Sequence, residues 1–177
     1  ADELGVLRGA VRRHCVKDSV AALEKLMARE FGDTDLVAIY VDGIIVAKHH
    51  LIAAIGVDVT GAKHMLGLVS GSSENAKVVK DLLSGLAERG VDMNVARLWV
   101  IDGSKALRSA IEQVCADAAH VQRCRIHKIR NVTERLPKAR AAQTRWVMAQ
   151  ALKGDADADI LKLKAHAKHL KAQHPDA

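Results

Sequence analysis

The pattern of apolar and polar residues divides the chain into a helical, a strand-forming and a second helical stretch. Residues 4–30 carry apolar side chains at helical spacing, and a polar break at residues 17–19 predicts two short helices. Helical spacing returns after residue 128, with interruptions at Pro137 and Gly154 that predict three further helices. Between these stretches a strand pattern with short connections predicts a meander of three antiparallel strands, over residues 36–46, 51–59 and 63–69.

The middle of the chain alternates between helix and strand. A helix is predicted over residues 75–89 and ends at Gly90, and a strand over 96–101, a helix over 104–115 and a strand over 119–126 follow. A right-handed crossover after the third strand places the fourth strand parallel to the first and beside it. We therefore expect an α/β fold with a mixed five-stranded sheet, three antiparallel strands and then two parallel strands, flanked by helices.

Two of the predicted strands lead into the same dipeptide. The run Leu36–Val41 ends at Asp42-Gly43, and the run Leu98–Ile101 ends at Asp102-Gly103. If these strands are neighbours, both carboxylates lie at the carboxyl edge of the sheet, where α/β proteins bind their ligands. Two adjacent carboxylates repel each other unless a cation bridges them, so the pattern predicts a magnesium or manganese site suited to phosphodiester chemistry.

Each of these residues also has a simpler interpretation. Asp42-Gly43 between apolar runs is a strong hairpin signal, and Asp102 with Ser104 can form a helix cap. A zinc site is a further alternative, although the spacing of its candidate ligands matches no common zinc finger. Those candidates are Cys115, His120, Cys124 and His127.

The charge of the chain is uneven. Residues 1–120 carry a net charge of −2, whereas residues 121–177 contain 13 Lys and Arg against 5 Asp and Glu, a net charge of +8. A basic C-terminal third is suited to binding a polyanion. The alternative interpretation is that these charges form a solvated helical face. An acidic cluster at residues 155–159 is expected to be solvated. The basic residues expected to contact DNA phosphates are Arg123, Arg125, Lys128 and Arg130.

The composition narrows the function classes. Three cysteines form an odd and sparse set, and neither an apolar run of about 18 residues nor a cleavable leader occurs, which predicts a cytoplasmic protein that does not enter a membrane. Aromatic residues make up only 2% of the chain, which argues against a base-stacking platform. A small nucleotide-binding protein is disfavoured because no glycine-rich phosphate loop occurs.

Six motifs occur in order between about residues 30 and 140. They are Tyr-Val-Asp-Gly at 40–43, Ala-Ile-Gly-Val-Asp-Val-Thr-Gly at 54–61, Leu-Gly and Ser-Gly-Ser-Ser-Glu within 66–74, Leu-Ala-Glu-Arg-Gly-Val at 86–91, Ile-Asp-Gly-Ser-Lys-Ala-Leu at 101–107, and Gln-Arg-Cys-Arg-Ile-His-Lys-Ile-Arg-Asn-Val at 122–132. In sequence and spacing they resemble the bacterial Mutator-type insertion-sequence transposases. The resemblance implies an RNase H-like catalytic core with an Asp-Asp-Glu triad and two divalent metal ions, which cleaves and joins DNA at transposon ends.

The resemblance also implies roles for individual residues. Asp42 and Asp102 match the first and second catalytic aspartates, which hold the metal ions. Cys124 and His127 match a Cys-x-x-His signature that shapes the site. Glu74 falls on an acidic position of the family, although the tryptophan usual a few residues later is absent.

By the same resemblance the chain is expected to be a fragment. Residues 1–33 form a helical segment, 34–140 the catalytic core, and 141–177 the start of a helical insertion. The third carboxylate is then expected beyond Ala177, which leaves the two-metal site incomplete and the fragment inactive alone. The partners implied are transposon-end and target DNA in the bacterial nucleoid and further copies of the full-length protein. The alternative function is a non-catalytic, basic DNA-binding or assembly module derived from a transposase.

Overall fold

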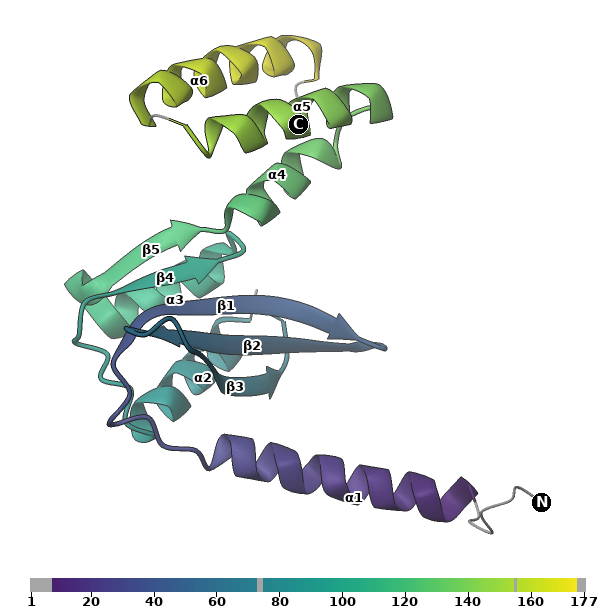
Figure 1. Cartoon of the computed structure of the whole chain (residues 1–177), viewed down its shortest axis with the longest axis vertical. Coiled ribbons are helices and arrows are strands. Elements are labelled where there is room, and N and C mark those ends of the chain that lie inside the picture. The colour runs from purple at the N-terminus through teal and green to yellow at the C-terminus, as the bar shows by residue number, and fades with distance from the viewer. Residues whose placement is uncertain (1–7, 73–74, 155, 175–177) are drawn as a thin grey trace. The chain divides into compact units, whose positions relative to one another are not determined.

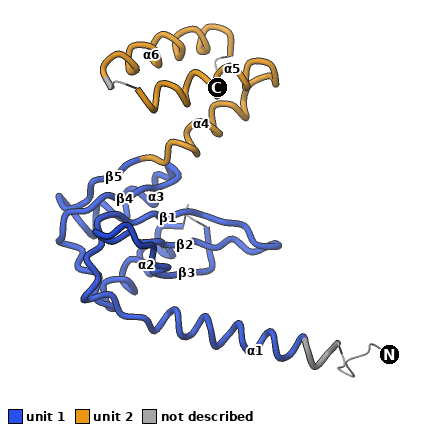
Figure 2. Tube along the Cα trace, in the orientation of Figure 1, with its two compact units in different colours: residues 1–122 blue, residues 123–177 orange. Residues whose placement is uncertain are grey.

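The computed structural model describes residues 8–72, 75–154 and 156–174 (Figure 1). Its contacts divide the chain into two compact units, Ala1–Gln122 and Arg123–Ala177 (Figure 2). The domain boundaries expected from the sequence lie after residues 33 and 140. The division into compact units does not test them, so they stay predictions. No helix in the described part of the chain combines the length and apolar composition needed to cross a bilayer.

The first unit is built on one five-stranded sheet with the strand order β3-β2-β1-β4-β5. Neighbouring strands β1, β2 and β3 are antiparallel, whereas β1 and β4 are parallel. The α/β class and the mixed sheet are therefore confirmed, and the arrangement is consistent with an RNase H-like core. The strands are β1 (Leu36–Val46), β2 (His49–Asp58), β3 (Lys63–Ser70), β4 (Arg97–Ile101) and β5 (Ala119–Arg123).

Strand β1 continues through the Asp-Gly pair. Asp42 is the register partner of Ala53, and Gly43 is the partner of Ile52 on β2. The chain reverses only at residues 47–48, where Ala47 has a φ of 56°. The alternative of a hairpin turn at Asp42-Gly43 is therefore wrong, because the apolar residues after Gly43 extend the strand instead of starting a new one.

Two helices cover one face of this sheet. Helix α2 (Ala76–Glu88) begins at Asn75, whose side chain accepts hydrogen bonds from the backbone N–H groups of Lys77 and Val78. Helix α3 (Lys105–Cys115) packs beside it, and a single turn of 3-10 helix, η1 (Ala116–Ala118), leads into β5. The resulting core joins both helices to β1, β2, β3 and β4 through buried residues that include Ile39, Ile52, Leu66, Leu83, Trp99 and Ile111.

Gly90 ends α2 as the sequence predicts. Its φ is 91°, a conformation that other residues rarely adopt, and a Cβ there would lie 2.6 Å from the backbone nitrogen of Gly32. The tight approach brings the segment before β1 against the end of α2, where Phe31 N–H donates to the carbonyl of Arg89 at 2.7 Å. Glycine at this position therefore ties β1 to the helix layer.

Helix α1 (Arg8–Met27) is one continuous helix, so the prediction of two short helices is wrong. The polar residues at the expected break are satisfied within the helix. Ser19 Oγ donates to the carbonyl of Cys15 at 2.7 Å, and Asp18 lies 3.5 Å from His14 one turn earlier. A hydroxyl that bonds to the preceding turn does not act as a cap, which explains the error.

The second unit contains the three expected helices, α4 (Arg125–Thr133), α5 (Lys138–Ala151) and α6 (Ala156–Gln173). Thr144 of α5 is fully buried, and its Oγ1 lies 3.2 Å from Nε2 of His166 on α6. Asp159 is buried and pairs with Lys162 at 2.9 Å, so the expectation of a solvated acidic cluster is wrong for this residue. Asp155 lies outside the described residues, and Asp157 is exposed.

Candidate active site

Asp42 and Asp102 lie at equivalent points on two neighbouring strands. Val41 of β1 is the register partner of Ile101 of β4, and each aspartate is the next residue along its own strand direction. Neighbouring strands lie about 4.8 Å apart, so the backbones of the two aspartates are close together. Asp102 directly follows the end of β4, whereas Asp42 lies within β1, which continues to Val46. Both residues are partly buried. The expected placement of β1 beside β4 is therefore confirmed, and the sharing of a metal ion by the two carboxylates stays a prediction.

The backbone around Asp102 holds its carboxylate in one orientation. Its Oδ1 accepts a hydrogen bond from the backbone N–H of Ser104 at 2.8 Å, across a turn in which Gly103 has a φ of 108°. Ser104 caps α3, because its Oγ accepts from the backbone N–H of Leu107 at 3.2 Å. Ser104 rather than Asp102 thus supplies the cap of the helix, and Asp102 braces the turn between strand and helix.

The donor atoms of this pair suit a hard divalent cation. Carboxylate oxygens are the ligands that Mg²⁺ and Mn²⁺ prefer, and two of them on neighbouring backbones can share one ion. In the part of the chain that the structure describes, no group of three or more His, Cys, Asp or Glu residues is arranged to hold a metal ion. Glu74, which the resemblance places near the site, lies outside the described residues.

Cys124 and His127 occupy the first turn of α4. Cys124 is the N-cap residue, without a capping side-chain hydrogen bond, and His127 follows three positions later. Both are partly buried, and residues three apart lie on the same face of a helix. This pair belongs to the unit 123–177, whereas Asp42 and Asp102 belong to the unit 1–122.

The zinc alternative has no support in the environment of Cys115. This thiol is buried, and its sulfur lies 3.9 Å from the sulfur of Met93 in the hydrophobic core. Burial raises the pKa of Cys115, which disfavours the thiolate that zinc needs. Cys115 is therefore a core residue, as its position on the inner face of α3 indicates.

The four basic residues expected to contact DNA differ in their surroundings. Arg125 Nη1 donates to the carbonyl of Leu152 at 3.0 Å, which ties α4 to the end of α5. Arg130 lies 3.8 Å from Glu134, and Lys128 is exposed. Arg123 Nη2 donates to Asn131 Oδ1 at 2.9 Å in the amide orientation that also lets Asn131 donate to the carbonyl of His127.

Sequence patterns did not single out a cluster around Asp58. This carboxylate accepts hydrogen bonds from the backbone and hydroxyl of Thr60, at 2.8 and 2.6 Å, and lies 2.7 Å from His64 Nε2. The hydrogen bond from Thr60, followed by that from His64, holds the pKa of Asp58 far below its usual range. The signal in the sequence was the Asp-x-Thr-Gly pattern of a turn, and the cluster braces the connection between β2 and β3.

Comparison with known proteins identifies the family. The family model described as "Transposase, Mutator family" matches residues 19–175. The chain is 35% identical over 109 residues to a probable insertion-sequence transposase of Corynebacterium diphtheriae, which covers 62% of the chain and 28% of the relative. It is 30% identical over 122 residues to the ISRM5 transposase of Rhizobium meliloti (strain 1021), which covers 67% and 30%.

A third relative is the IST2 transposase of Acidithiobacillus ferrooxidans, 27% identical over 128 residues, with 69% of the chain and 43% of the relative covered. The chain thus spans less than half the length of each of these relatives. The family model, in contrast, extends across the sheet, α3 and all three helices of the second unit. With so much of its length matched, the chain belongs to the Mutator family of transposases.

Proposed function

We propose that Asp42 and Asp102 supply two carboxylate ligands to a Mg²⁺ site in a transposase that cleaves and joins DNA at insertion-sequence ends. The observation that supports the proposal is the register of β1 and β4, in which Val41 and Ile101 are partners and an aspartate follows each of them. Membership of a transposase family supports the DNA substrate. The DNA of the bacterial nucleoid is then the natural target.

The residues of the chain contribute to this site by position and charge. Asp42 is fixed by the continuous pairing of β1 with β2, and Asp102 by its hydrogen bond to the backbone of Ser104. When bound, a pair of Mg²⁺ ions would activate the attacking oxygen and stabilise the leaving oxygen of a phosphodiester. Two pre-positioned carboxylates reduce the reorganisation that metal binding would otherwise require.

The site needs a further carboxylate, which we propose the full-length transposase supplies from outside the described residues. The basis is that no third acidic residue joins Asp42 and Asp102 in the described part of the chain. We accordingly propose that the 177-residue chain binds metal weakly and does not cleave DNA by itself. Cys124 and His127, and Glu74 after β3, are proposed to shape the site rather than to take part in the reaction.

Mn²⁺ binding tests this proposal without requiring activity. We expect titration of the 177-residue chain, followed by the electron paramagnetic resonance of free Mn²⁺, to show a weak site that is lost in Asp42→Asn and in Asp102→Asn. Asn preserves the side-chain oxygen that accepts from Ser104, so the turn is kept. The matched control is Asp81→Asn, an exposed carboxylate on α2. Equal Mn²⁺ affinity in all four proteins would contradict the proposal.

A second candidate function is a non-catalytic DNA-binding or assembly module. It is favoured by the net charge of +8 in residues 121–177. This stretch begins within β5 and includes α4, α5 and α6. Counterion release would make such binding strongly dependent on salt. Salt-dependent DNA binding that survives Asp42→Asn, in a chain without Mn²⁺ affinity, would favour this module over the metal-dependent core.

A further inference from the structure

Most of the described side chains of α1 are exposed. This is true of every side chain from Arg12 to Lys25, whereas Leu26 and Met27 at the end of the helix are partly buried. An isolated helix of this length is marginal in water, because helices in proteins are stabilised mainly by packing of an apolar face. A helix of 20 residues with so little contact is therefore expected to pack against a partner.

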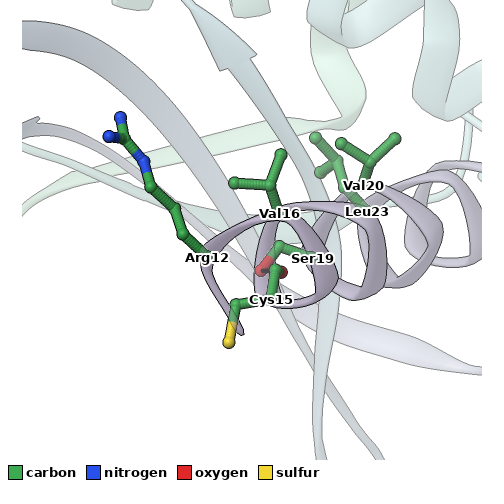
Figure 3. Close-up of a pocket in the computed structure, with 6 residues that line it drawn as sticks. All are labelled: Arg12, Cys15, Val16, Ser19, Val20 and Leu23. Carbon is green, nitrogen blue, oxygen red and sulfur yellow. Dashed lines mark hydrogen bonds between the residues drawn. The ribbon is translucent and has the colours of Figure 1, made fainter. Parts of the chain in front are cut away.

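An apolar stripe runs along the exposed part of the helix. Val16, Val20 and Leu23 are 56%, 50% and 43% exposed, and Figure 3 shows their side chains on one side of α1, with Cys15 pointing to the other. With Met27 they follow the alternating spacing of four and three residues that marks the a and d positions of a coiled coil. This surface, Val16, Val20, Leu23 and Met27, is called the α1 stripe below.

The charges beside the α1 stripe fit a second copy of the same helix in one orientation only. If Val16 and Leu23 are d positions, Lys17 and Glu24 are the flanking e positions. In an antiparallel pair with Val20 opposite Leu23 of the second copy, Lys17 lies beside Glu24 of that copy, and the contact occurs twice by symmetry. In a parallel pair Arg12 would instead lie beside Lys17 of the second copy, which is repulsive.

We propose that the α1 stripes of two copies of this chain pack antiparallel and form a homodimer. The interface consists of four apolar layers, in which Val20 meets Leu23 and Val16 meets Met27 of the other copy, each twice by symmetry. Two Lys17–Glu24 pairs flank these layers, and Ser19 of each copy lies at the margin. Because so narrow a surface is near the lower limit of specific interfaces, the dimer is expected to form at concentrations of roughly 10–100 μM. This inference is independent of the proposed metal site, since α1 contains neither Asp42 nor Asp102.

Charge reversal tests both the partner and the orientation. The 177-residue chain is examined by sedimentation velocity over a range of concentrations. Lys17→Glu and Glu24→Lys each place like charges at both symmetric contacts and should raise the dimer Kd by roughly five- to thirty-fold. The double variant Lys17→Glu/Glu24→Lys restores opposite charges and should return the Kd to near that of the parent protein.

Substitution within the stripe gives an independent test. Val20→Asp places a charge in two symmetric apolar layers and should leave the protein monomeric at the highest concentration examined. Ala22→Asp, on the opposite side of the same exposed helix, introduces the same charge and should leave the dimer intact. A parent chain that stays monomeric, a dimer that persists in Val20→Asp, or a double charge variant that fails to recover would overturn the proposal.

Discussion

Val41 of β1 and Ile101 of β4 are partners in the parallel register, and an aspartate follows each of them in the chain. Like charges directly across neighbouring strands are destabilising, by roughly 0.2–1 kcal/mol at a partly exposed site. The register therefore places two acidic residues on neighbouring strands, where like charges are expected to repel each other in the absence of a cation. A cation shared between them removes that cost, which is the physical reason to connect this pair with metal binding.

The first prediction follows from this repulsion. Asp42→Asn should stabilise the first unit in the presence of EDTA by about 0.5 kcal/mol, because one of two like charges is removed. In millimolar Mn²⁺ the order should reverse, since only the parent chain gains stability from binding the ion. Thermal unfolding followed by the fluorescence of Trp99, which is buried in the core of this unit, measures both effects.

The exposed carboxylate Asp81 provides the control for this measurement. Asp81 pairs with Lys77 on the surface of α2, so Asp81→Asn should give the same small change with and without Mn²⁺. A variant at Asp42 that is less stable than the parent in EDTA would contradict the inferred repulsion. In that case another group already compensates the charge of Asp42 in the folded chain.

The second prediction concerns the turn that orients Asp102. Gly103 has a φ of 108°, which a residue with a Cβ adopts only at a cost of about 1–3 kcal/mol. Gly103→Ala should therefore lower the free energy of unfolding by about this amount and weaken Mn²⁺ binding. Urea unfolding and Mn²⁺ titration measure the two effects. Gly85 lies near the end of α2, where a Cβ meets nothing within 4 Å, so the control variant Gly85→Ala should instead stabilise the chain.

The sequence was sufficient to predict the sheet and the neighbouring positions of the two strands that lead into Asp42 and Asp102. Apolar periodicity defined each strand to within three residues, and the handedness of the crossover placed β4 beside β1. Asp42 and Asp102 could be paired from the sequence alone, because both directly follow apolar runs on strands that this rule makes neighbours. Local pattern and global topology agreed at this point, which makes the prediction strong.

The errors arose where a polar residue is satisfied by a neighbour that the sequence does not identify. Ser19 bonds to the turn before it instead of starting a helix, and Asp159 is buried beside Lys162 at the start of α6. In both cases the polar side chain is satisfied by a residue three or four positions away in the same helix, and the sequence pattern does not show which partner it takes. Strand β5 ended early for a related reason, since Arg125 already lies in α4, where it bonds to the end of α5.

The third prediction is a dependence of stability on pH through Asp58. Hydrogen bonds from Thr60 and His64 hold the pKa of this carboxyl below its unfolded value, so the unfolded chain takes up the proton first as the pH falls. The stabilisation is complete above the ordinary carboxyl pKa of about 4 and is lost progressively below it. Asp58→Asn should therefore be less stable than the parent at pH 7, and the difference should shrink at pH 3.

Urea midpoints at the two pH values provide the measurement for Asp58. Asp81→Asn again serves as the control, because it removes a carboxyl that lacks this network of hydrogen bonds. If the difference in stability between Asp58→Asn and the parent is the same at pH 7 and pH 3, the lost stability comes from contacts that do not depend on the charge of Asp58. The hydrogen bonds to the ionised form would then contribute nothing to stability.

The fourth prediction separates the basic residues of α4 by their contacts. Lys128 is exposed, so Lys128→Gln should lower the affinity for duplex DNA and reduce the slope of log K against log salt by about 0.9. Its effect on stability should be within about 0.5 kcal/mol. Arg125→Gln also removes the hydrogen bond to the carbonyl of Leu152, and should lower the free energy of unfolding by about 1–2 kcal/mol as well.

Fluorescence anisotropy of labelled duplex DNA at several salt concentrations, together with urea unfolding, distinguishes these two residues. Lys164 on α6 provides a matched lysine outside α4, and Lys164→Gln shows how much affinity any single charge in the basic unit contributes. If Lys128→Gln and Lys164→Gln reduce binding equally, DNA contacts the second unit through its general charge. A larger effect at Lys128 locates the phosphate contacts on α4, directly after β5.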